Sequence, residues 1–108
     1  MTTSKYYVYV INLDSKMLKI KKFMGQNPDY IDGKPCVYVG QSFHKPEIRF
    51  EQHLNGYKAN KYVKKFGNFL RFRNTGVNNP YKSRMIAEKA EKETTRRLRA
   101  KGYGVWSN

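Results

Sequence analysis

The sequence predicts an α+β fold, a small three-stranded antiparallel sheet flanked by helices, in a single domain that covers residues 1–108. Three observations lead to this prediction. The length is that of one domain. Short runs rich in tyrosine and valine alternate in the way that half-buried strands do. A charged segment near the C-terminus, free of glycine and proline, has the length and composition of a long helix.

Two of the tyrosine- and valine-rich runs predict the first two strands, at about residues 5–12 and at residues 36–40. Side chains alternate across a strand, so if the valines of both runs pack together, Tyr9 and Tyr38 lie on the same opposite face. Ordinary cross-strand aromatic packing is the alternative to a functional role for these tyrosines. The long connection, residues 13–35, begins as a short helix or an extended piece and continues as a loop.

The next segments predict two helices and a third strand. Pro46 suits a first helical position and Gly56 suits a helix end, which places a helix at about residues 46–55. A short, strongly basic helix follows at 58–66. The alternation of aromatic, aliphatic and arginine side chains at 68–74 then predicts a strand.

The longest helix is predicted over residues 81–102, with Gly102 at its end. After it, we expect Val105 and Trp106 to pack back on the core. These last residues are assigned no strand.

Three glutamates lie on the long helix, and helical spacing separates them. Glu88 and Glu93 fall among basic side chains on the solvated side, whereas Glu91 falls on the least charged face. An inward-facing carboxylate needs a partner, because burying an unpaired charge is expensive. Glu91 is therefore either part of a buried ion pair with an arginine or a metal ligand.

Arg49 and His53 are four residues apart, so they are neighbours on one face of the predicted helix. Phe50 and Leu54 form an adjacent apolar stripe that we expect to fix the helix against the sheet. The alternatives are a surface ion pair between Arg49 and Glu51, and a half-exposed surface role for His53.

The chain has 22 Lys and Arg against 8 Asp and Glu, a net charge of +14. Residues 55–108 hold 14 basic and 3 acidic side chains, whereas residues 1–54 hold 8 and 5. Such an excess favours a polyanion, and we expect a nucleic acid rather than an anionic membrane surface. The alternative is a basic surface that binds nothing.

The cysteine content and the hydropathy of the sequence bear on the cellular location of the protein. Cys36 is the single cysteine, so no internal disulfide can form. No stretch approaches the ~20 apolar residues that span a bilayer, and the first residues have no signal-peptide pattern. We therefore expect an intracellular, cytoplasmic protein with no membrane partner.

Taken together, the motifs resemble the GIY-YIG nuclease family. "YVY" at 7–9 and "YVG" at 38–40 stand where the family has its two tripeptides, with Tyr7 in place of the first glycine. Three more features follow in the family's order: the Arg-x3-His spacing at 49–53, "AEKAE" at 87–91 and Asn108.

The resemblance implies metal-dependent hydrolysis of DNA phosphodiesters, with RNA not excluded, and a divalent ion, Mg²⁺ or Mn²⁺, at Glu91. Tyr9 is the favoured base and Tyr38 positions water or phosphate, although either phenol fits the base role. Arg49 would stabilise the transition state. His53 would orient a tyrosine or shuttle a proton, and Asn108 would orient the phosphate or the glutamate.

Other residues are predicted to bind the substrate. Gly40 either lets a phosphate approach the backbone or is a simple turn glycine. Four lysines would contact phosphates without reading sequence: Lys58, Lys61, Lys64 and Lys65. A second basic cluster either touches the substrate or is merely solvated: Arg96, Arg97, Arg99 and Lys101.

Two other functions stay open. The chain could be a nucleic-acid-binding module of the same fold without turnover, whose tyrosines stack on bases. It could also be a basic structural partner of RNA assemblies. A binder has no need of an inward carboxylate, so Glu91 separates these functions from the nuclease. A monomer and a homodimer are both compatible with the sequence.

Overall fold

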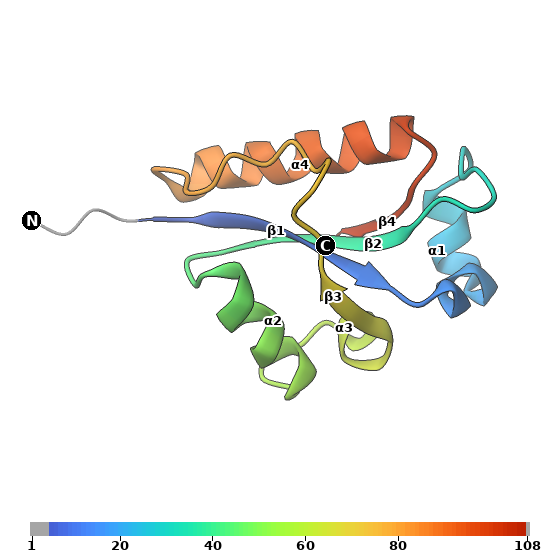
Figure 1. Ribbon diagram of the computed structural model, residues 1–108, viewed down its shortest axis with the longest axis horizontal. Helices are drawn as coiled ribbons and strands as arrows, with labels where there is room; N and C mark the ends of the chain where they lie inside the picture. Colours follow the sequence, from blue (N-terminus) through green and yellow to red (C-terminus); the bar gives the residue numbers. More distant parts are fainter. Residues whose placement is uncertain (1–4, 108) are drawn as a thin grey trace, which may run out of the picture.

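The computed structural model describes residues 5–107, in which one sheet carries helices on both of its faces (Figure 1). The elements follow in the order β1 (Tyr7–Leu13), the 3-10 helix η1 (Ser15–Lys19), α1 (Lys21–Gln26), β2 (Cys36–Ser42), α2 (Pro46–Leu54), α3 (Lys61–Phe66), β3 (Gly67–Leu70), α4 (Arg84–Ala100) and β4 (Gly104–Ser107).

The sheet has four strands in the order β3-β1-β2-β4. β1 is antiparallel to both β2 and β3, but β4 is parallel to β2. The α+β class is therefore confirmed, whereas the prediction of three antiparallel strands is wrong. A four-residue strand is too short to show an alternation pattern. Its partner is decided by where the long crossover through α4 returns the chain to the sheet.

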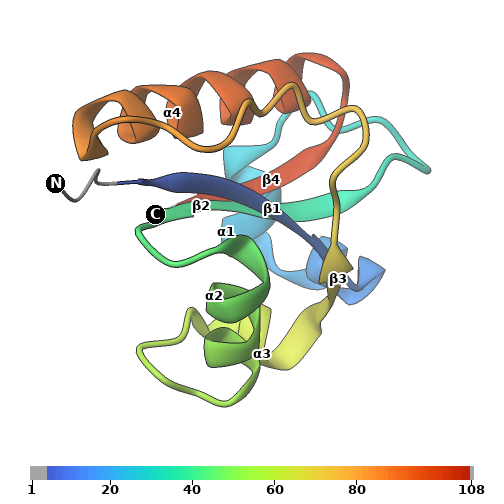
Figure 2. The same ribbon diagram turned by 60° about the vertical axis from the view of Figure 1, so that its left-hand side comes forward.

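The predicted separation of valines and tyrosines is confirmed. β1 and β2 pair with Val10 opposite Val39 and with Tyr9 opposite Gly40. One face of the sheet, the valine face, packs against α4, and α2 and α3 lie against the other, the tyrosine face (Figure 2). The valine-face core consists of Val8, Val10, Val37, Val39, Ala87, Leu98 and Val105.

The connection between β1 and β2 adds core to the tyrosine face. It forms η1 and α1, and Met17 and Phe23 from these short helices are fully buried. The side chain of Asp14 accepts a hydrogen bond from the Lys16 amide at 2.8 Å, which caps η1. The first half of the connection is therefore helical, and the extended alternative is excluded.

Asparagine side chains satisfy backbone groups of β1 and β4 at positions that no neighbouring strand pairs. Asn79 accepts from Val8 N at 2.8 Å and donates to Val8 O at 2.7 Å. Asn27 does the same for Val105, at 2.8 Å and 3.0 Å. At these two positions the amides take the place of a neighbouring strand, so the backbone groups of Val8 and Val105 are satisfied.

Several element boundaries differ from the predicted ones. α3 begins at Lys61, because the Asn60 side chain accepts hydrogen bonds from two amides of the first turn. Lys58 therefore lies outside the helix, in a turn with φ of 43°. β3 covers only Gly67–Leu70 of the predicted strand.

The packing of α2 also differs from the prediction. His53 is 1 % exposed at the end of this helix, whereas Leu54 is 43 % exposed. Phe50 packs on the core as expected. In the last turn of α2, His53 rather than Leu54 faces the core.

In the described part of the chain, no helix combines the length and the apolar character that crossing a bilayer requires.

Candidate active site

Two strands and one helix bring three polar aromatic side chains together on the tyrosine face. Tyr9 of β1, Tyr38 of β2 and His53 of α2 are all at least 96 % buried. The ring centroids of Tyr9 and Tyr38 are 6.0 Å apart, and that of His53 lies 5.5 Å from Tyr38. Strand alternation and cross-strand register place the two tyrosines, and the last turn of α2 adds the imidazole.

The protonation of His53 follows from its two hydrogen bonds. The Asn60 amide donates to Nδ1 at 3.1 Å, so Nδ1 carries no proton. Nε2 therefore holds the proton and donates it to the Tyr9 hydroxyl oxygen at 3.0 Å. Burial, with the nearby Arg49 cation, lowers the pKa of His53 to about 4, so the ring is neutral at pH 7. This arrangement suits a group that orients Tyr9.

Both tyrosines hold their protons tightly. Burial, and then the neighbouring Tyr38, raise the pKa of Tyr9 far above its usual value, and Arg49 opposes this only in part. Burial is also the largest cause of a raised pKa at Tyr38. A phenolate at neutral pH therefore requires more positive charge than Arg49 alone provides.

Arg49 extends from α2 toward Tyr9 and Tyr38, and it lines a cavity with both. Its Nη2 donates to Lys58 O at 2.8 Å, and its Nη1 donates to Tyr57 O at 3.2 Å. Nη1 also donates to Gln52 Oε1, at 3.2 Å. These three bonds leave part of the guanidinium for a ligand, and that part also interacts with the Tyr9 hydroxyl. Among the described residues Arg49 forms no ion pair with Glu51, so that alternative is excluded.

Glu91 reaches the tyrosines from the other side of the sheet. α4 buries Ala87, Thr94 and Leu98 against the valine face, and Glu91 lies at the border of that surface, half-buried. Within residues 5–107 its carboxylate has no ion pair and no hydrogen bond to a side chain or amide. The alternative of a buried pair with an arginine is therefore excluded. Burial and then Glu88 raise the pKa of Glu91 to about 7.

These side chains line one cavity of about 350 Å³, which we call the candidate cavity. β4 pairs with β2 only from Cys36 to Val39, so the last residues of β2 have no strand on that side within the described chain. The carboxylate of α4 and the phenols of the opposite face meet at this open end. The lining residues are Tyr9, Tyr38, Gln41, Arg49, Glu88, Glu91 and Lys92.

Three of the lining residues were not predicted to belong to the site. Glu88 was expected on the solvated side, but it is half-buried and borders the cavity while pairing with Arg84 at 3.0 Å. The signal was available, since Glu88 and Glu91 are three residues apart and share a helical face. Gln41 and Lys92 carried no such signal.

The candidate cavity offers some, but not all, of the ligands that a divalent cation needs. Glu91 and Glu88 offer carboxylate oxygens in one cavity, and Mg²⁺ is often held by one or two carboxylates with water and substrate phosphate. In the described chain no group of three or more His, Cys, Asp or Glu could hold a metal by itself. A cation here would therefore depend on water or a phosphate for its remaining ligands.

Gly40 has a packing role next to the tyrosines. A Cβ at this position would lie 2.5 Å from the Tyr9 hydroxyl oxygen and 2.9 Å from Tyr38 Cε2. Only glycine leaves room for the phenol of its cross-strand partner.

The predicted substrate lysines lie outside the candidate cavity and are exposed. Lys61 and Lys65 line a groove of about 640 Å³ together with Lys16 and Lys19 from η1. The β1–β2 connection thus adds two cations to the basic surface of α3. Tyr62, which lies between these lysines in the sequence, is buried, and its ring meets that of Trp106 edge-on with the centroids 4.9 Å apart. Asn108 lies outside the described residues.

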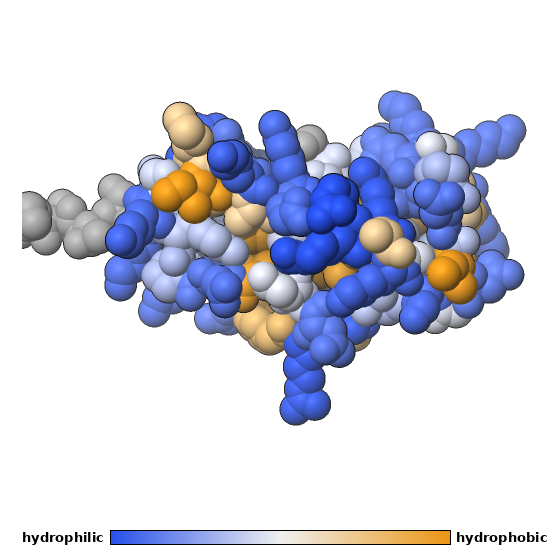
Figure 3. Space-filling model, turned by 90° about the horizontal axis from the view of Figure 1, so that it is seen from above, coloured by the Kyte–Doolittle hydropathy of each residue, from blue (hydrophilic) through white to orange (hydrophobic). Residues whose placement is uncertain are grey.

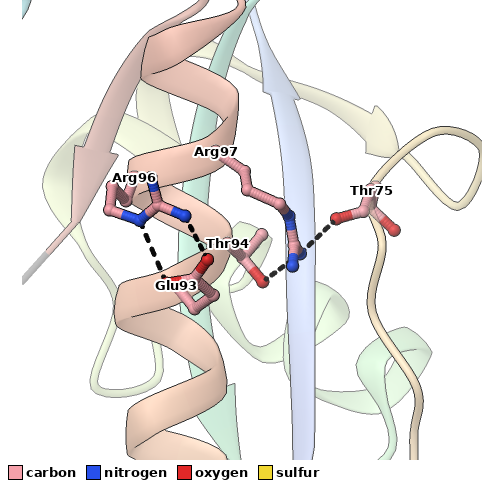
Figure 4. Close-up of polar contacts among 5 residues, drawn as sticks. All are labelled: Thr75, Glu93, Thr94, Arg96 and Arg97. Atoms are coloured by element: carbon pink, nitrogen blue, oxygen red, sulfur yellow. Dashed lines mark hydrogen bonds and ion pairs between the residues drawn. The ribbon is translucent and has the colours of Figure 1, made fainter.

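The second basic cluster is mostly bound to the protein itself. Arg97 reaches Thr75 O at 3.1 Å and Arg96 pairs with Glu93 (Figure 4). Arg99 donates to Asn27 Oδ1 and to Val105 O. From above α4 the surface is mainly hydrophilic (Figure 3). Arg97 and Arg99 therefore tie α4 to neighbouring segments.

No family model, no curated protein and no solved structure matches this chain. The resemblance to the GIY-YIG family therefore rests on the residues of the chain itself.

Proposed function

We propose that this protein is a GIY-YIG-type, metal-dependent endonuclease that hydrolyses DNA phosphodiester bonds. The observation that carries the proposal is the meeting of Tyr9, Tyr38, Arg49 and Glu91 in the candidate cavity. These residues come from four separate elements, and they include a half-buried carboxylate that has no ion pair among the described residues and shares a cavity with a guanidinium. A purely structural role does not explain this carboxylate, since an unpaired charge at such a place is destabilising.

The side chains suit the parts of a hydrolysis in which water attacks phosphorus and the bond to the leaving oxygen breaks. The Arg49 guanidinium would donate to non-bridging phosphate oxygens and stabilise the charge that develops on them. Tyr9 would accept the proton of the attacking water as a phenolate, and the His53 N–H would stabilise that anion. Tyr38 would position the water or the phosphate.

Glu91, with Glu88 beside it, would hold Mg²⁺ or Mn²⁺. Such an ion would supply positive charge next to the phosphate and the tyrosines. A base role for Tyr9 or Tyr38 would require that charge, because burial raises the pKa of both phenols.

The test is nicking of supercoiled plasmid with Mg²⁺ and with chelator, by the wild type and by Glu91→Ala. We expect nicking only by the wild type with metal, and a loss of at least about 100-fold in Glu91→Ala. Glu93→Ala is the matched control, because Glu93 is exposed on the same helix and pairs with Arg96. Cutting in chelator, or full activity of Glu91→Ala, would overturn the role of Glu91. Binding without any cutting would favour the non-catalytic module.

A further inference from the structure

A second hollow adjoins the candidate cavity and was not predicted from the sequence. It is a groove of about 380 Å³, here called the aromatic groove, and it shares Gln41 and Arg49 with the candidate cavity. Its other lining residues are Tyr6, Ser42, Phe43, His44, Gln52, Tyr57, Lys58 and Arg84. A ligand that reaches Arg49 from the candidate cavity can therefore continue into this groove.

Two large rings in the aromatic groove are exposed to solvent. Phe43 is 68 % exposed and Tyr57 is 57 % exposed. The ring of Phe43 lies beside that of His44, with centroids 4.1 Å apart. Because both rings bury little area in the folded chain, their exposed surfaces are accessible to a ligand that can stack on them.

The charge of the groove complements a polyanion. Arg49, Lys58 and Arg84 line it, of which Arg84 also pairs with Glu88, and none of its described lining residues is acidic. Arg49 holds the turn that carries Tyr57 and Lys58, through their two carbonyl oxygens. The proposed phosphate ligand and the ring-bearing turn are thus one connected unit.

We propose that the aromatic groove binds an unpaired nucleotide next to the phosphate that is cut, so that the substrate is DNA with a single-stranded segment at the cleavage site. This inference rests on the proposed function for the position of the cut. A base inside a duplex has both faces covered by its neighbours and cannot stack on a side chain. Stacking on Phe43 or Tyr57 therefore requires a base that has left the duplex or was never paired.

The experiment measures binding in chelator, so that it does not depend on cleavage. A short single-stranded oligothymidylate is compared with the same oligonucleotide carrying abasic sites, which keeps the phosphates and removes the bases. For the wild type we expect the loss of bases to weaken binding about ten-fold. In Phe43→Ala and Tyr57→Ala we expect the two oligonucleotides to bind nearly equally.

Phe69→Ala is the matched control, because Phe69 is a half-exposed ring that does not line the groove. It should keep the wild-type difference between the two oligonucleotides. The groove is excluded if the wild type does not distinguish them, or if all three variants distinguish them equally. Plasmid nicking without base discrimination would overturn this inference alone, whereas discrimination without nicking would overturn the proposed hydrolysis and leave the groove as a nucleotide-binding site.

Discussion

The two faces of the sheet are built from the same strands but differ in chemistry. On the valine face, aliphatic side chains of β1, β2 and β4 pack against α4, and all the residues of that core are at most 1 % exposed. On the tyrosine face, Tyr9, Tyr38 and His53 are nearly as buried but carry polar atoms. The His53–Tyr9 hydrogen bond, at 3.0 Å, satisfies part of that polarity.

Because side chains alternate along β1 and β2, the stabilising aliphatic core lies on one face of the sheet and the candidate site residues lie on the other. Burial on the valine face stabilises the fold, and none of the seven residues of its core is ionisable. Burial on the tyrosine face instead shifts the pKa values of phenols, an imidazole and a carboxylate that approaches from α4. Changes on the first face should therefore alter stability, and changes on the second should alter activity.

The largest expected effect is that of Tyr9→Phe on turnover. Without the hydroxyl the proposed base is lost, and we expect about a thousand-fold slower cleavage with DNA binding retained. Tyr62→Phe is the control, because Tyr62 is also buried on this face but does not line the candidate cavity. Single-turnover rates measure cleavage by each variant, and binding isotherms measure its affinity for DNA. Wild-type turnover in Tyr9→Phe would move the base to Tyr38 or another group.

On the valine face the expected effect is on stability alone. Leu98 of α4 is 1 % exposed, and Leu98→Ala should lower the free energy of unfolding by about 3 kcal/mol through lost burial and a residual cavity. Urea unfolding measures this loss. The protein that remains folded should cleave at the wild-type rate. A specific loss of turnover in the folded fraction would show that the two faces are not separate.

Next in size is the effect of the α3 lysines on DNA binding. Changing Lys61, Lys64 and Lys65 together to glutamine should reduce the slope of log K against log salt by about 2 to 3, if each contacts a phosphate. The control changes three exposed lysines in or next to α4, over the valine face: Lys82, Lys89 and Lys101. Equal effects of the two triple variants would mean that DNA has no preferred face.

The smallest expected effect is a pH-dependent gain of stability in Glu91→Gln. The folded-state pKa of about 7 lies above the usual 4.5, so the wild type loses stability as pH rises from about 4.5 to 7. The variant lacks this loss and should be more stable at pH 8 by about 1 kcal/mol, discounted because the carboxylate is half-exposed. At pH 4 the two proteins should unfold alike.

Thermal unfolding at both pH values measures this effect. Glu93→Gln is the control. Arg96 lowers the pKa of Glu93, so removing the Glu93 carboxylate should not increase stability at high pH. A pH-independent difference between Glu91→Gln and the wild type would mean that Glu91 is not desolvated in the folded protein.

Much of the candidate site was predictable because it depends on local periodicity. Alternation placed Tyr9 and Tyr38 on one face, and helical spacing turned Glu91 inward. The four-residue spacing of Arg49 and His53 brought both toward the tyrosines. Each of these rules needs only the conformation of one element and its buried side.

The parts that were missed depend on segments that meet only in the folded chain. Glu88 borders the cavity because β4 stops short of the end of β2, and the pairing of β4 was not predicted. The His53 tautomer follows from the Asn60 amide, seven residues away. Of the two carbonyl partners of Arg49, Lys58 was predicted to begin a helix but lies in a turn.

By itself the sequence determined the α+β class, the two faces of the first strands, the basic surface and the chemical types available for a site. Composition and periodicity are sufficient for these, because burial acts on each element through its own apolar pattern. Only the tertiary structure decided the parallel fourth strand, the joining of Glu91 to the tyrosines and the aromatic groove. These depend on contacts between distant segments, which no local pattern encodes.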